Sequence, residues 1–211
     1  MIIIRLINDC GIAATDFETI TTAVKYFVPK VAKAWDIPDV IVVNGGTPAA
    51  GDWLVYATEK NRHLGALGYH TVKAGTPVAY CSLKAVNGKL FGAYHKPLVV
   101  KGKTLRPATY SSGLVTVLCH EIAEMLCDPQ IATLSAKDTL GRQWIVEVCD
   151  HVYGSNFMCG PSVLPDVTTP AFYDLKGTAP FSLQNATNAP FTMTPKGYGY
   201  YMDATGKLVK I

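Results

Sequence analysis

Residues 119–128 carry a histidine and three carboxylates close together in the chain. At 3.6 residues per turn, a helix places these side chains within an arc of about 100°; they are His120, Glu121, Glu124 and Asp128. Carboxylates held side by side repel one another, and burial adds a desolvation cost to each of them. A bound divalent cation offsets both effects, so the pattern indicates a metal site.

His120 and Glu124 are one helical turn apart and are the first candidate ligands. Glu121 follows His120 directly, as the general base does in the His-Glu-x-x-His motif of metalloproteases. In this chain Glu124 stands where that motif has its second histidine, and carboxylate oxygen is also a zinc ligand. The alternative interpretation is an ordinary solvated helix face, on which glutamates at this spacing are common.

A second group of ionisable residues lies in the apolar segment 143–151. A catalytic zinc site takes three protein ligands and leaves one position for water. We predict Glu147 as the third ligand, with Asp150 accepting the free ring N–H of His120. The alternative for Glu147 and Asp150 is an ordinary surface salt bridge.

Together these residues resemble a family of zincin-like metallopeptidases that occur as short proteins in bacteria and phages. The resemblance covers roughly the last two-thirds of the chain and rests on His120-Glu121-x-x-Glu124-x-x-x-Asp128-Pro129, Trp144, Glu147-Val148-Cys149-Asp150, Gly68-Tyr69-His70, Pro77-Val78-Ala79-Tyr80 and residues 165–174. Besides Glu124 in place of the second histidine, it departs from better-understood zincins in spacing: Glu147 and Asp150 are one residue closer together than the corresponding pair.

The resemblance implies a zinc-dependent peptidase whose metal is held by His120, Glu124 and Glu147. Glu121 would act as the general base toward the water that attacks a peptide carbonyl. Two carboxylate ligands make the ion a weaker Lewis acid, so Mn²⁺ or Ca²⁺ is an alternative to zinc.

The resemblance also suggests roles for residues around the metal. Asp150 and Asp128 would orient the ligands from outside, although Asp128 precedes a proline and is equally a candidate for bonding the backbone at the helix end. Zincins commonly draw an oxyanion contact from a tyrosine or histidine. Tyr153 and His151 are the candidates here, and packing is the alternative role for Tyr153.

The residues and the resemblance allow three classes of function. In the first, the protein is a metallopeptidase that acts on a peptide or protein substrate. In the second, it is a phage virion structural or assembly protein that keeps a zincin-like fold with little or no catalytic activity, and its partners are virion proteins. A hydrolase that has lost its metal and acts only by binding is a third possibility.

Composition and charge indicate how the chain is organised and which partners it is expected to have. The 211 residues are 49% hydrophobic and 17% charged, which predicts a folded chain of one domain, or one domain with an appendage. The net charge of +3 is spread along the sequence, so neither nucleic-acid nor membrane binding is expected. The N-terminus is too short in its apolar run for a signal peptide, which predicts cytoplasmic synthesis, with association with a virion as the alternative.

The predicted fold class is α+β and zincin-like: a mixed β-sheet, a long N-terminal helix, an active-site helix and a small β-rich C-terminal part. Residues 1–155 form the predicted zincin-like domain, and residues 156–211 form an extension packed on it. Apolar periodicity predicts a helix from about residue 15 to 35, kinked or split at Pro29. A second helix is predicted over about residues 112–127, capped by Ser111 or Ser112.

Short apolar runs predict strands at residues 2–7, 40–43, 53–58, 67–73, 76–83, 181–183, 191–194, 198–202 and 208–211. The strand at 76–83 is either an edge strand that pairs with extended substrate or an interior strand. The basic residues between Lys84 and Arg106 are predicted to lie in loops and edge strands.

Other residues that often bind metals receive ordinary roles. His63, His70 and His95 are dispersed and are predicted as hydrogen-bonded or surface histidines. The six cysteines form no Cys-x-x-Cys pair, which argues against a cysteine zinc knot. Most of them are predicted to be small buried apolar residues.

Overall fold

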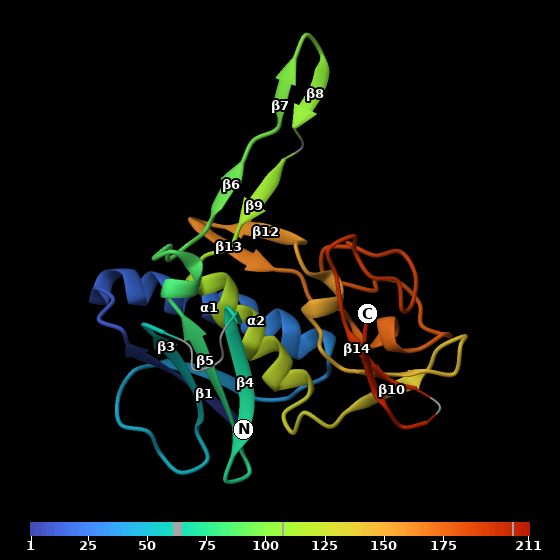
Figure 1. The fold of residues 1–211 in the computed structure, drawn as a ribbon. Coiled ribbons are helices and arrows are strands. Elements are labelled where there is room, and N and C mark those ends of the chain that lie inside the picture. Colours follow the sequence, from blue (N-terminus) through green and yellow to red (C-terminus); the bar gives the residue numbers. More distant parts are fainter. Residues whose placement is uncertain (61–64, 107, 204) are drawn as a thin grey trace.

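A mixed five-stranded sheet packs against two α-helices, with small antiparallel sheets in the C-terminal part (Figure 1). This computed structural model describes residues 1–60, 65–106, 108–203 and 205–211. The predicted α+β class, with a long N-terminal helix and a second helix beside a mixed sheet, is confirmed.

The central sheet has the strand order β2-β1-β3-β5-β4. Its strands are β1 (Ile2–Asp9), β2 (Val40–Asn44), β3 (Trp53–Thr58), β4 (Gly68–Lys73) and β5 (Thr76–Ser82). All neighbours pair in parallel except β4, which pairs antiparallel with β5 and forms one edge. The segment 76–83 is therefore an interior strand, and the edge beside the second helix is β4.

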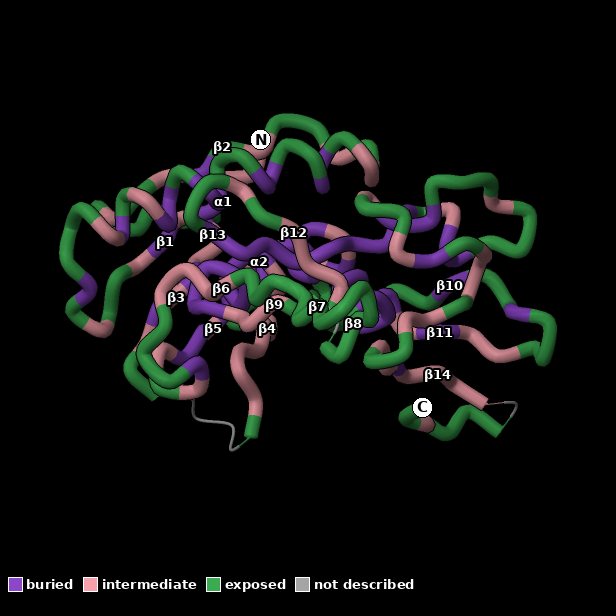
Figure 2. The backbone as a smooth tube through the Cα atoms, turned by 90° about the horizontal axis from the view of Figure 1, so that it is seen from above, coloured by how far each residue is buried: buried purple, intermediate pink, exposed green. Residues whose placement is uncertain are grey.

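Both helices lie side by side on one face of this sheet. Helix α1 (Ala14–Ala34) contacts β2 and α2, while α2 (Leu114–Cys127) contacts β3, β4 and β5. Their apolar side chains meet the alternately buried residues of β1 and β3, such as Ile4, Leu6 and Val55. This contact forms the core, seen as the purple centre of Figure 2.

Helix α1 runs through Pro29 without being split, contrary to one predicted alternative, and begins at Ala14, close to the predicted start at about residue 15. Proline removes the backbone hydrogen bond to the carbonyl four residues earlier. Pro29 and Lys25 are both exposed, so the lost hydrogen bond lies on the solvent-facing side of the helix. The apolar face of the helix is not interrupted.

The segment 89–92 packs against the start of helix α2, so closely that only glycine fits at position 113. Helix α2 begins at the next residue, Leu114. A Cβ on Gly113 would lie 2.2 Å from Gly92 N. The first helical amides donate to the Lys89 and Leu90 carbonyls at 2.8 and 3.0 Å, in place of the predicted serine cap. These contacts fix where the helix starts and therefore where its ionisable residues lie.

The C-terminal part contains a four-stranded sheet of order β10-β11-β14-β15 and a hairpin, β12–β13. The bounds are β10 (Leu134–Lys137), β11 (Gln143–Ile145), β12 (Asn156–Cys159), β13 (Ser162–Pro165), β14 (Tyr200–Met202) and β15 (Leu208–Lys210). Strand β11 lies in the predicted domain 1–155, and β14 lies in the predicted extension 156–211. Because these strands pair, backbone hydrogen bonds join the two parts. The predicted strand at 181–183 is reduced to a single bridge between Thr168 and Ser182, and no strand covers 191–194.

Three short 3-10 helices complete these connections: η1 (Lys84–Val86), η2 (Asp150–Val152) and η3 (Pro170–Tyr173). All six cysteines are free. Within the described residues, neither α-helix combines the length and apolar character needed to cross a bilayer.

A hairpin arm projects from the body between β5 and α2 (Figure 1). At its base β6 (Ala93–His95) pairs with β9 (Thr109–Ser111), and further out β7 (Leu98–Val100) pairs with β8 (Lys103–Arg106). Lys101 and Gly102 turn the chain at the tip with positive φ values of 48° and 76°. Some of the basic residues predicted to lie in loops and edge strands therefore lie in this projecting two-stranded ribbon.

Candidate metal centre

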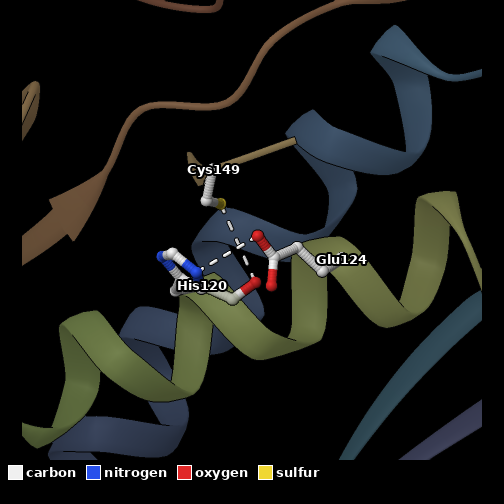
Figure 3. Close-up of side chains that lie close together, drawn as sticks. All are labelled: His120, Glu124 and Cys149. Atoms are coloured by element: carbon white, nitrogen blue, oxygen red, sulfur yellow. Dashed lines mark hydrogen bonds and ion pairs between the residues drawn. The ribbon is translucent and has the colours of Figure 1, made fainter. Parts of the chain in front are cut away.

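Three separate elements bring ionisable side chains together beside α2. His120, Glu121 and Glu124 come from the helix itself, as its periodicity predicts. Glu147 and Asp150 come from the segment that follows β11, and His70 comes from the edge strand β4. Figure 3 shows His120 and Glu124 on one side of the helix, with Cys149 approaching from the segment above.

The two histidines lie against different oxygens of Glu124. His120 Nε2 is 3.1 Å from Glu124 Oε1 and 3.2 Å from Asp150 Oδ1. His70 Nδ1 is 3.6 Å from Glu124 Oε2 and 3.4 Å from Glu121 Oε2. Glu124 therefore lies between the two imidazoles.

A glycine allows β4 to approach the helix. A Cβ on Gly68 would lie 2.6 Å from both Glu121 Oε1 and Val117 Cγ1. His70 is two residues further along the same strand, so its side chain is on the same face and points toward α2. The absent side chain at position 68 is what allows His70 to reach the glutamates.

Replacing Gly68 with alanine is expected to destabilise the protein by about 1–3 kcal/mol, because the added methyl overlaps a packed helix face. Urea unfolding measures this loss. Thr71→Ala, on the opposite face of the same strand, serves as the control and should cost less than Gly68→Ala. Equal stability of Gly68→Ala and wild type would show that β4 and α2 are not in close contact.

The cluster is buried, and its polar atoms are only partly satisfied. Glu121, Glu124 and Asp150 are 5%, 3% and 7% exposed. In the part of the chain that the structure describes, the buried atoms His70 Nε2 and Glu147 Oε2 have no hydrogen-bonding partner, and Glu124 Oε1 and Asp150 Oδ1 have only their ion pairs with His120 Nε2. Buried polar atoms are nearly always paired in folded proteins. Their convergence fits a cation.

Electrostatics lead to the same conclusion. Burial, followed by the charges of Glu124 and Asp150, raises the pKa of Glu147 to about 10. Burial also raises the pKa of Glu124. For His120, burial lowers the pKa, but Glu124 and Asp150 outweigh it, and the pKa is well above its ordinary value. Without a cation, burial and the neighbouring carboxylates therefore keep Glu147 protonated at pH 7.

Among the described residues, two groups of three have ligand atoms within 4.8 Å of one another: His120, Glu124 and Cys149, and His70, Glu124 and Glu147. Buried His, Glu and Cys groups able to hold a metal ion are thus present. The predicted ligands His120, Glu124 and Glu147 are divided between the two groups, and Glu124 is in both. Thiolate, imidazole and carboxylate are all zinc ligands.

A cleft of about 1030 Å³ opens over this cluster. His120, Glu121 and Cys149 line it, together with the segment 108–112 at the base of the arm. Glu121 is therefore at the cleft surface, although little of it is exposed. A molecule in the cleft would meet the carboxylate of Glu121 and the imidazole of His120.

The two predicted oxyanion candidates have different surroundings. Tyr153 lines the cleft, and its ring centroid is 6.5 Å from that of His120. His151 is fully buried, and its Nδ1 is 3.0 Å from the hydroxyl of Tyr173. Burial lowers the pKa of His151 to about 4, so this imidazole is neutral at pH 7. It packs in the aromatic core beside Trp144.

Asp128 bonds the turn that follows the helix. Its oxygens accept hydrogen bonds from the amides of Ala132 and Thr133 and from the Thr133 hydroxyl, at 2.8–3.1 Å. This is the helix-end role considered for it from the sequence. Asp150, in contrast, lies against His120 Nε2, the same ring nitrogen that faces Glu124, and not against the free ring nitrogen predicted for an orienting carboxylate.

Three residues of the site were not predicted from their chemistry: His70, Cys149 and Tyr198. Tyr198 lines the cleft, and burial together with its interaction with Asp150 raises its pKa above the ordinary value. Of the other dispersed histidines, His95 is exposed, with Nε2 3.4 Å from Ser111 Oγ. His63 lies outside the described residues.

Comparison with protein-family models, curated proteins and solved structures finds no match for this chain.

Proposed function

We propose that the protein is a divalent-metal-dependent hydrolase, with zinc as the expected metal and peptide bonds as the expected substrate. The observation that supports this most is the convergence of imidazole, carboxylate and thiol ligand atoms within 4.8 Å of one another beneath a cleft lined by Glu121. A glutamate next to metal-binding residues but outside both ligand groups is available as a base. The resemblance to zincin-like metallopeptidases favours the same reaction.

In this proposal His120 and Glu124 hold the ion, and Glu147 or Cys149 completes the ligand set. Bound zinc supplies Lewis-acid polarisation of a carbonyl and lowers the pKa of water. Glu121 takes a proton from water in the cleft and passes it to the leaving amine. His70 Nδ1, 3.4 Å from Glu121 Oε2, holds that carboxylate in place.

Elemental analysis of protein purified without chelator tests the metal centre. Wild type is expected to carry at least about one zinc ion per chain, and His120→Ala is expected to bind it much more weakly. His95→Ala is the matched control, because His95 is exposed and belongs to neither ligand group. Absence of any divalent metal from wild type would rule out the metal-dependent hydrolase.

A second candidate function, a virion structural or assembly protein, is favoured by the hairpin arm. Residues 93–111 contain Lys96, Lys101, Lys103 and Arg106 and no acidic residue. Leu98, Val99, Val100 and Leu105 on the same arm are about half exposed. An isolated two-stranded ribbon gains little stability by itself, so its apolar side chains suit contact with another protein.

The charge of the arm indicates an acidic partner protein and disfavours pairing with the arm of a second copy. We expect a peptide of alternating glutamate and valine to bind the protein, and Lys101→Glu with Lys103→Glu to weaken binding at least about tenfold. Fluorescence anisotropy at low salt measures the affinity. Binding that is equal in wild type and variant would remove the support for this function.

A further inference from the structure

We propose that the cluster holds two divalent cations, bridged by Glu124. His120 and Cys149 would bind one of them, and His70 and Glu147 the other. This inference rests on the proposed function, because it assumes that the cluster binds metal at all. It extends the function from a single ion to a two-ion centre.

The first argument is the position of Glu124 between two ligand groups. Glu124 belongs to both groups of ligand atoms, and no other residue is shared between them. Its Oε1 lies 3.1 Å from His120 Nε2, and its Oε2 lies 3.6 Å from His70 Nδ1. Each oxygen of one carboxylate thus faces a different imidazole. This arrangement suits a carboxylate that binds one ion through each oxygen.

The second argument is charge. Glu121, Glu124, Glu147 and Asp150 bring four carboxylates into one buried cluster. Within the described residues, their ion pairs are with His70 and His120, both of which would be neutral as metal ligands. With Cys149 bound as a thiolate the cluster carries five negative charges, of which a single divalent ion would balance two. Two divalent ions would balance four of them.

The third argument concerns the atoms that a single ion beside His120 leaves unexplained. His70 Nε2 and Glu147 Oε2 are both buried and without a hydrogen-bonding partner in the described structure. The His70 side chain is only 8% exposed, so bulk water does not solvate its ring. An imidazole and two carboxylates form a ligand set suited to Zn²⁺ or Mn²⁺. Binding of the second ion through His70 Nε2 accounts for both atoms and leaves Nδ1 facing Glu121 Oε2.

The two sites differ in their access to the cleft. His120 and Cys149 line the cleft, whereas Glu124 and Glu147 are not among its lining residues. In two-metal hydrolases the ions lie about 3.5–4 Å apart and share the charge that develops during reaction. The ion near His70 would lie beside Glu121, whose carboxylate is 3.4 Å from His70. The second ion would thereby also position the proposed base.

Metal stoichiometry tests the inference without measuring activity. Metal-free protein is dialysed against buffered Zn²⁺, and bound zinc is counted by elemental analysis. Wild type and the His95→Ala control are expected to bind about two ions per chain, and His70→Ala about one. Glu147→Gln is a second variant that changes little volume, and it should also bind about one.

Spectroscopy of Mn²⁺-loaded protein provides an independent readout. Two bridged Mn²⁺ ions give a spin-coupled resonance spectrum, which should be lost in His70→Ala while a single-ion spectrum remains. One ion per wild-type chain, or two ions in both His70→Ala and Glu147→Gln, would overturn the two-ion centre. One ion that depends on His120 but not on His70 would overturn the inference and leave the proposed function intact, whereas no ion in wild type would overturn both.

Discussion

Removing metal from the protein is expected to cost more stability at pH 8 than at pH 5. In the metal-free fold the pKa of Glu147 is raised to about 10 from 4.5, by burial and by its carboxylate neighbours. A group with a raised pKa in the folded state contributes stability below its unfolded pKa and loses it as pH rises toward the folded value. The pKa values of Glu124 and His120 are also raised, so they act in the same direction.

The size of this effect follows from linkage. A carboxyl that stays protonated in the folded protein and ionises in the unfolded chain costs about 1.4 kcal/mol per pH unit. Three pH units therefore set an upper limit of about 4 kcal/mol for Glu147, and relaxation of the cluster reduces it to about 2–4 kcal/mol. The melting temperature of metal-free protein should fall by about 5–15 °C between pH 5 and pH 8.

Thermal unfolding of chelator-treated and zinc-loaded protein across this pH range measures the prediction. The loaded protein should change less, because bound metal keeps its ligands deprotonated and binds more tightly as pH rises. Glu147→Gln removes the titrating group, so its metal-free form should lose less stability over the same range. A metal-free wild type whose melting temperature stays constant or rises with pH would contradict the prediction.

The helix part of the site could be predicted from sequence because the information is local. A period of 3.6 residues places His120, Glu121 and Glu124 on one side wherever the helix lies in the fold. The apolar stripe from Leu114 to Leu126 then determines which side faces the core. Glu147 and Asp150 also reach the cluster, although that required the chain to return to the helix after a polar connection.

His70 could not be placed in the same way, because its position depends on long-range strand pairing. The histidine belongs to the site only because β4 is the antiparallel edge strand, with β5 between it and β3. No local pattern distinguishes that order from one with β5 at the edge. The clue in the sequence was Gly68, two residues earlier, which becomes informative once the close approach to Glu121 is known.

The hairpin arm was missed for a compositional reason. Lysine, glycine and proline between residues 96 and 107 are typical of loops, and no buried face enforces alternation. The predicted split of α1 at Pro29 was wrong for a different reason: the proline lies on the exposed face of the helix, which tolerates the lost hydrogen bond. Both cases show burial, rather than local propensity, determining the structure.

Replacing Glu121 with glutamine is expected to abolish peptide hydrolysis while leaving the metal in place. Glu121 is outside both ligand groups, and it lines the cleft. Glutamine has nearly the same shape and can still hydrogen-bond His70, but its amide cannot accept the proton of the attacking water. Loss of a general base lowers kcat/KM by about 10²–10⁴-fold.

The comparison with Glu124→Gln makes this result specific. Glu124 is common to both ligand groups, so its variant should lose metal and activity together, whereas Glu121→Gln should lose activity alone. Glu121→Gln should also be at least as stable as wild type, since it removes one of several repelling carboxylates. A screen with mixed peptide substrates, run beside zinc analysis and thermal unfolding, separates these outcomes. Full hydrolysis by Glu121→Gln would exclude Glu121 as the base. A metal-loaded wild type without hydrolysis would favour the assembly protein. In that protein the same ions would hold α2, β4 and the segment after β11 together.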